Sequence, residues 1–280
     1  MEKYHIERNT VQETLVIPLY GRKVCAEHYP ELFEAREAAR ICDSLDYDFT
    51  EKGKAMESVA GLFGAMEVAQ RHYDLLWEVR DYLKEHPEAA VVNMGCGLDD
   101  SFSKADNGSC RGYSIDFPDV IKIRNDILGQ GEREDNIASD LLDFRWMDKI
   151  DSSKGAIFLA AGVFYYLKNA DVIRLIGKLN ERFPGAVVVF DSCNERGARL
   201  MRKTWLKEAD IDVSAYFSVN NSSELESWNI GSKKISERSY MRGYRDIFSK
   251  VSLIHKVLII FCDKLVRMKI VKIELLGEQK

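Results

Sequence analysis

The central part of the chain alternates between strands and helices, and this alternation limits the fold more than any other feature. Five strands are predicted there, at residues 89–94, 111–115, 136–139, 155–160 and 186–190. Helical patterns follow the second strand at residues 119–128 and the fourth at residues 173–179. Short apolar strands joined by helical crossovers are typical of parallel sheets covered on both faces. The pattern therefore predicts an α/β fold with a mostly parallel sheet.

The residues before this core have a different pattern. Residues 14–22 form an apolar segment that ends in a turn, and residues 31–42 are predicted to form a short helix. A longer helix is predicted at residues 58–84, because its apolar side chains recur on one face. We expect residues 1–88 to form a helical lid or cap over the core.

The residues after the core are expected to complete the sheet and one side of a binding site. One helical turn is predicted at residues 225–228, an amphipathic helix at 246–266 and a last strand at 269–275. We expect this strand to join the edge of the sheet in an antiparallel direction. With core residues 89–195 and a substrate-side segment at 196–280, the 280 residues are expected to form a single domain.

Composition argues against several classes of protein. The formal net charge of −5 and the pI of about 5.7 do not suit nucleic-acid binding, which needs clustered Lys and Arg. The charged start has no secretory signal, and the apolar run at residues 257–262 is too short to span a bilayer. The six cysteines show no CxxC spacing, so no metal site or disulfide framework is expected. We predict a cytoplasmic protein with no membrane partner.

The first predicted strand runs into a glycine turn, Gly95-Cys96-Gly97, and Asp116 ends the second strand 21 positions beyond Gly95. In open parallel sheets, ligands bind at the carboxyl ends of the strands. Glycine lets a ligand approach the backbone closely, and an acid at the position of Asp116 can accept hydrogen bonds from both ribose hydroxyls. The pattern predicts a nucleoside-containing ligand, although a purely structural turn is the alternative.

Two acids after the glycine turn distinguish between cofactors. A dinucleotide site needs a third glycine, and Asp100 stands in its place, beside Asp99. Two carboxylates there would repel a pyrophosphate. S-adenosylmethionine has no phosphate and carries a sulfonium and an ammonium, which acidic neighbours suit. The sequence therefore favours S-adenosylmethionine as the cofactor and disfavours NAD.

Two more strand ends supply candidate site residues. After the third strand, Asp140 could accept a hydrogen bond from an adenine amino group while Leu141 packs on the ring; the alternative for Asp140 is a helix N-cap. After the fourth strand, Tyr165 and Tyr166 stand at the usual edge of a transfer site. Core packing is the alternative for these tyrosines, and we expect it for one of the two.

Taken together, these segments resemble the leucine carboxyl methyltransferase family, most closely its bacterial polyketide O-methyltransferase branch. The matching stretches run in order along the chain at residues 13–22, 91–99, 116–121, 139–143 and 162–167. The resemblance implies a class I S-adenosylmethionine-dependent methyltransferase, with a Rossmann-like sheet of seven strands whose last strand is antiparallel. It also implies S-adenosylhomocysteine as the product.

The resemblance implies roles for particular residues. Arg71, at the start of the helix before the first strand, would pair with the carboxylate of the cofactor. Gly95 would contact its methionine part and Asp116 its ribose, with Asp140 and Leu141 beside adenine. The remaining predicted cofactor contacts are Cys96, Gly97, Phe117 and Ala161. Two positions depart from the family: Ala161 replaces the glutamate of members that methylate a protein C-terminus, and Ser101 replaces an arginine common in bacterial relatives.

The resemblance also predicts O-methylation of a small molecule, at a carboxylate or a phenol. A carboxylate is ionised at pH 7 and needs no catalytic base, so no catalytic residue is expected; a hydroxyl would need Tyr, His or Asp nearby. Predicted substrate residues are Tyr20, Arg22 and Tyr166. Arg22 would steer an anionic acceptor, or else be a solvated turn residue. A protein or peptide carboxyl methyltransferase and a non-catalytic cofactor-binding protein are the alternative functions, and the oligomeric state stays open.

Overall fold

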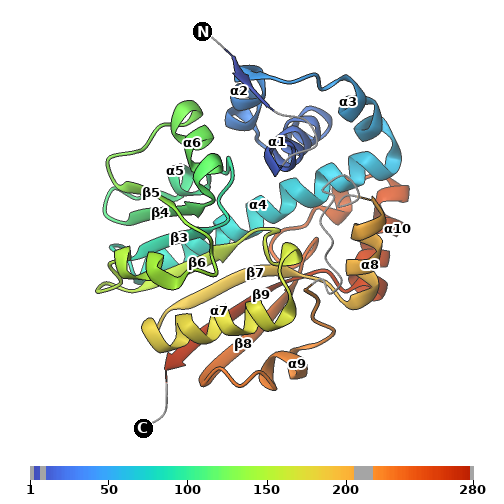
Figure 1. Ribbon diagram of the computed structural model, residues 1–280. Coiled ribbons are helices and arrows are strands. Elements are labelled where there is room, and N and C mark those ends of the chain that lie inside the picture. Colours follow the sequence, from blue (N-terminus) through green and yellow to red (C-terminus); the bar gives the residue numbers. More distant parts are fainter. Residues whose placement is uncertain (1–2, 7–10, 205–216, 278–280) are drawn as a thin grey trace.

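The computed structural model describes residues 3–6, 11–204 and 217–277 (Figure 1). Seven strands form one sheet in the order β5-β4-β3-β6-β7-β9-β8. The five predicted core strands are its parallel part: β3 (Ala90–Met94), β4 (Arg111–Asp116), β5 (Glu134–Ala138), β6 (Ala156–Ala160) and β7 (Val187–Ser192). The predicted α/β class and mostly parallel sheet are confirmed.

The C-terminal strands were predicted less well. β9 (Lys269–Gly277) is antiparallel to β7, as predicted, but it does not lie at the edge of the sheet. It lies between β7 and β8 (Ser232–Ser239), so β8 is the edge strand, and the sequence prediction missed it. β8 reads SKKISERS, and its charges suit an edge strand and hide the apolar pattern of a buried strand.

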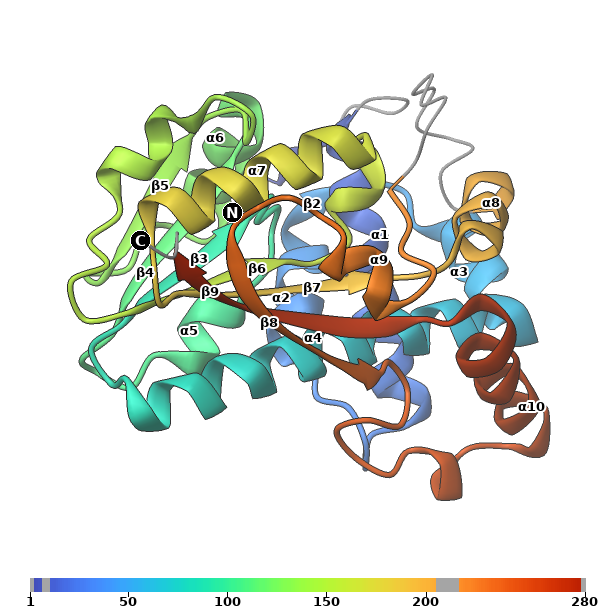
Figure 2. The same ribbon diagram turned by 90° about the horizontal axis from the view of Figure 1, so that it is seen from below.

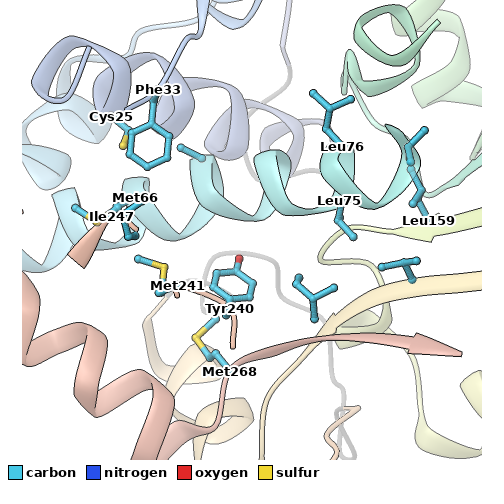
Figure 3. Packing of buried hydrophobic residues seen from close by; sticks show 14 of the residues in the cluster. Cys25, Phe33, Met66, Leu75, Leu76, Leu159, Tyr240, Met241, Ile247 and Met268 are labelled. Carbon is cyan, nitrogen blue, oxygen red and sulfur yellow. The ribbon is translucent and has the colours of Figure 1, made fainter. Parts of the chain in front are cut away.

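A hydrophobic layer on each face of the sheet packs it against helices. The long helix α4 (Val59–Glu85) packs on one face with α5 (Ser101–Ala105), while α7 (Asn169–Arg182) and the 3₁₀ helix η1 (Phe144–Lys149) pack on the other (Figure 2). Figure 3 shows α4 buried on two sides, with Cys25 and Phe33 on one and Tyr240 and Met268 on the other. Ser58 is the N-cap of α4, and its side chain accepts a hydrogen bond from Gly61 N, so the helix predicted at residues 58–84 is confirmed.

The N-terminal region is more helical than the sequence predicted. The segment at residues 14–22 does not end in a turn; it lies inside α1 (Val11–His28), although Pro18 and Gly21 break the helical pattern. A side chain at position 21 would lie at an ordinary contact distance of 3.5 Å from Ala65 Cα, so α1 packs directly against α4 at this point. α2 (Arg36–Ser44) and α3 (Thr50–Glu57) follow, and β1 (Tyr4–His5) pairs with β2 (Leu45–Asp46).

Shorter elements connect the sheet and close one side of it. α6 (Pro118–Ile127) packs on β4 and β5, η2 (Phe164–Tyr166) follows β6, and α8 (Glu195–Thr204) follows β7. The helical turn predicted at residues 225–228 overlaps only the end of α9 (Ser222–Glu226). The helix expected at 246–266 is divided into η4 (Phe248–Lys250), α10 (Leu253–Phe261) and the π-helical turn η5 (Cys262–Val266). No helix among the described residues has the length and apolar character needed to cross a membrane.

Candidate functional site

A cavity of about 730 Å³ lies at the carboxyl ends of the parallel strands, a size typical of cofactor and small-molecule pockets. Each of the five strands contributes a residue at or just after its end: Gly95, Asp116, Ser139, Ala161 and Asp191. Helix α1, one face of α4, and the α10–η5 segment complete the wall. The sheet therefore gathers the predicted glycine turn and acidic residues in one place.

The glycine turn has the backbone shape that its sequence suggests. Gly95 and Gly97 have φ angles of +67° and +48°, in the left-handed region that disfavours side chains. The N–H groups of Gly95 and Cys96 both donate to Ile115 O, which ties the turn to the neighbouring strand β4. Both glycines and Cys96 line the cavity.

Asp116 is held in place by the turns around it. Its Oδ2 accepts a hydrogen bond from Gly97 N at 2.8 Å, and its Oδ1 accepts one from Phe117 N at 2.8 Å. Each carboxylate oxygen has a second lone pair, so both can still accept a ligand hydroxyl. Burial raises the pKa of Asp116, and the two N–H donors oppose that rise. The two acceptor oxygens fit the two hydroxyls of a ribose.

The predicted adenine contacts lie next to Asp116. Phe117 is 47% exposed and lines the cavity, as do Asp140 and Leu141. Asp140 Oδ1 accepts from Leu142 N at 2.8 Å, whereas Asp143 caps the following 3₁₀ helix. The N-cap alternative for Asp140 is therefore wrong, although its role beside adenine stays a prediction.

Arg71 lies in the middle of α4 and not at the start of a helix, because α4 begins at Val59. Its Nη1 pairs with Asp191 Oδ2 at 3.3 Å, and Asp191 Oδ1 accepts from Gly162 N at 2.6 Å. A guanidinium has five N–H donors, so this pair leaves Arg71 able to bind a carboxylate. Ala161 lines the cavity beside this group.

Asp99 and Asp100 are both paired with side chains of the protein. The sequence prediction treated them as free negative charges that would face a ligand, and the structure does not support this. Asp100 pairs with Arg22 at 2.5 Å and with Lys104 at 3.0 Å, and Asp99 Oδ2 lies 2.9 Å from His72 Nδ1. Burial would raise the pKa of both acids, but Arg22 and His72 hold them below their ordinary values. His72, Asp99 and Asp100 are close enough to ligate a metal, yet Arg22 and Lys104 already neutralise Asp100.

Two of the three predicted substrate residues line the cavity, and the third does not. Arg22 is only 5% exposed and lies on α1 at the cavity, so the solvated-turn alternative is wrong. Tyr166 lines the cavity and is half-exposed, while Tyr165 is buried, in agreement with core packing for one of them. Tyr20 stacks on Phe49 with ring centroids 4.6 Å apart and is outside the residues that line the cavity.

The sequence analysis gave no role to several residues of the cavity wall, among them Glu67, His72 and Asp191. Asp191 ends a predicted strand, as Asp116 does, so the same rule could have identified it. Glu67 lies one turn before Arg71 on the same face of α4, a spacing that the sequence contains. The partner of His72, Asp99, lies 27 residues away and leaves no local signal.

Solved structures identify the class of fold. A protein from Thermobifida fusca YX, assigned as a methyltransferase, aligns with a TM-score of 0.58 and 13% identity, covering 91% of this chain and 94% of its own. A duf574 family protein from Streptomyces avermitilis MA-4680 aligns with a TM-score of 0.59 and 13% identity, covering 80% and 89%. The sheet, with one strand antiparallel to its neighbours, defines a class I methyltransferase fold.

Sequence comparison then identifies the family. Residues 27–180 match the leucine carboxyl methyltransferase family, and the chain belongs to that family. It is 24% identical to the tetracenomycin polyketide synthesis O-methyltransferase TcmP of Streptomyces glaucescens over 219 residues, 78% of each protein. The chain is thus an S-adenosylmethionine-dependent methyltransferase.

Proposed function

We propose that this methyltransferase transfers a methyl group to an oxygen atom of a small, apolar molecule. Similarity to an O-methyltransferase of polyketide synthesis supports oxygen as the acceptor atom. Both acceptor groups considered from the sequence, a carboxylate and a phenol, fall within this proposal. S-adenosylmethionine supplies the methyl group, activated on a sulfonium.

In this proposal, one half of the cavity holds the cofactor. Asp116 accepts hydrogen bonds from the two ribose hydroxyls, and Asp140 accepts one from the adenine amino group. Phe117 and Leu141 pack against adenine, while Arg71 binds the carboxylate. The glycine turn and Ala161 lie against the methionine part.

The other half of the cavity would hold the acceptor. Its wall is mostly apolar: Phe63 and Gly64 on α4, Leu258 and Phe261 on α10, and Met268 before β9. Phe261 is 40% exposed although it lines the cavity, so the acceptor half reaches the molecular surface near α10. Such a wall favours an acceptor with an apolar body.

The position of Asp116 is the observation that carries the cofactor half of this proposal, and its replacement tests that half. Asp116→Ala removes two hydrogen bonds to a charged acceptor, each worth about 1.5–3 kcal/mol, so we expect affinity for S-adenosylmethionine to fall by about 100-fold or more. Isothermal titration calorimetry measures the change. Asp119→Ala is the matched control, because Asp119 is exposed on α6 and lies outside the residues that line the cavity. Wild-type affinity in Asp116→Ala would overturn the ribose assignment.

A further inference from the structure

Beyond Arg71, the cavity wall contains a carboxyl group that the cofactor half does not use. Glu67 lies one turn before Arg71 on α4 and lines the cavity. Its Oε1 accepts a hydrogen bond from Cys262 Sγ at 3.4 Å, and its backbone oxygen accepts one from Tyr240 OH at 2.9 Å. Among the described residues, no lysine or arginine forms an ion pair with Glu67, because Arg71 pairs with Asp191.

The surroundings of Glu67 come from several elements, and few of them carry charge. The titratable groups that act on it are Arg71 on α4, Cys193 after β7, Tyr240 after β8 and Cys262 on η5. Burial therefore dominates and raises the pKa of Glu67 to about 7, against the opposing effects of Cys262 and Arg71. A carboxyl group with this pKa can accept and release a proton at neutral pH.

The charges on the cavity wall discriminate between the two kinds of acceptor. Both arginines among the described lining residues already have carboxylate partners: Arg22 pairs with Asp100, and Arg71 pairs with Asp191. In the proposed function the free donors of Arg71 bind the cofactor carboxylate, and Arg22 is held by Asp100. A carboxylate acceptor would therefore add a negative charge near Glu67 without an arginine of its own, which is costly in a buried site. A hydroxyl acceptor brings no charge and can donate its proton to Glu67.

A second polar atom points to the same region. The Tyr165 hydroxyl is buried at the cavity wall, and the weakly accepting Cys193 thiol is the one hydrogen-bond partner that the described residues offer it. Buried hydroxyls are normally satisfied, so a ligand oxygen is a fitting partner. The π-helical turn η5, which brings Cys262 to Glu67, is a feature found frequently at functional sites.

We propose that the acceptor is an apolar phenol or alcohol and that Glu67 is its catalytic base. The inference rests on the proposed function and specifies its acceptor. In the transfer, the acceptor O–H bond breaks and its proton passes to the Glu67 carboxylate. An oxygen electron pair forms the new O–CH₃ bond, and the electron pair of the broken S–CH₃ bond stays on sulfur. The proton then leaves through the exposed side of the cavity.

Glu67→Gln tests the proposal, because it keeps the shape of the side chain and removes the base. Glu85→Gln is the matched control, on the last residue of the same helix and exposed. The probes are naphthol and naphthoic acid, which share one apolar skeleton, and transfer is measured as release of S-adenosylhomocysteine. We expect wild type to prefer naphthol, with a rate that rises with pH and levels off above about 7. Glu67→Gln should lower that rate by about 100-fold or more while Glu85→Gln retains it.

A measurement of stability tests Glu67 without any acceptor. The native pKa of about 7 exceeds the ordinary value of 4.5, so the native state binds the proton more tightly than the unfolded state does. Ionising Glu67 therefore destabilises wild type as pH rises through this window. We expect the Tm of Glu67→Gln minus that of wild type to increase between pH 5 and about 7 and then to level off.

The possible outcomes separate this inference from the proposed function. Wild-type transfer to naphthol by Glu67→Gln, or a wild-type preference for naphthoic acid, would overturn the role of Glu67. A Tm difference that does not change with pH would also overturn it. Failure to bind S-adenosylmethionine would contradict the proposed function. If the enzyme binds it and methylates neither probe, the cavity does not accept a naphthyl skeleton, and the Tm difference decides the ionisation of Glu67 by itself.

Discussion

The role of a single residue in this protein can depend on a partner far away in the sequence. Arg22 was predicted either to steer an anionic acceptor or to be solvated, and neither prediction included Asp100, 78 residues away. The buried pair that they form lies at the N-terminus of α5, next to Ser101. Arg22 therefore supplies, from α1, a positive charge beside the turn that follows β3, and its guanidinium is already engaged.

This pair leads to a prediction about stability. Arg22→Ala leaves Asp100 buried with one cationic partner fewer, and breaking a buried ion pair from one side costs about 3 kcal/mol. Lys104, 3.0 Å from Asp100, limits the loss. Urea denaturation measures the free energy of unfolding, and the double variant Arg22→Met/Asp100→Leu should be less destabilised than Arg22→Ala. A change below about 0.5 kcal/mol, with an altered KM for the acceptor, would favour steering instead.

At the scale of elements, the turn after β6 connects the sheet to α4. Gly162 has a φ of +70°, its N–H donates to Asp191, and a side chain there would lie 2.5 Å from Arg71 Nη1. The absence of a side chain therefore lets Arg71 and Asp191 meet.

Gly162→Ala should weaken both folding and cofactor binding. The left-handed backbone costs about 1–2 kcal/mol for alanine, and the new methyl group displaces the Arg71 guanidinium. Gly185→Ala is the matched control: its φ is +88°, and a side chain there meets nothing within 4 Å. We expect similar backbone strain in both variants, measured by denaturation, but reduced S-adenosylmethionine affinity only in Gly162→Ala. Equal affinities would show that Arg71 does not bind the cofactor.

At the scale of the whole molecule, cofactor binding must appear as stability, because a ligand of the native state alone shifts the folding equilibrium. S-adenosylhomocysteine at 100 times its Kd should stabilise the protein by about 2.7 kcal/mol, which raises the Tm by several degrees. NAD at the same concentration should leave the Tm unchanged. Differential scanning fluorimetry measures both effects, with Asp116→Ala as the unresponsive control. An equal shift with NAD would contradict the assignment of the cofactor site.

Much of the core was predictable because its signals are local. Apolar runs and the helical patterns between them set the parallel strands, and Asp116 follows from the rule that such strands end at one edge of the sheet. The helical state of α1 was not predictable in this way, because Pro18 and Gly21 disturb its pattern and packing against α4 compensates. The edge strand β8 was missed because its charged sequence does not resemble a buried strand.

The sequence by itself determined the α/β class, the five parallel strands, the glycine turn and the acid that follows it. Only the tertiary structure decided that β9 lies inside the sheet, that Asp100 meets Arg22, and that Glu67 faces Cys262 from 195 residues away. The spacing of apolar residues along the chain indicates which face of a helix or strand is buried, because that pattern is local. Ion pairs, raised pKa values and cavity walls depend on which distant elements pack together. Burial of the whole hydrophobic core determines that packing.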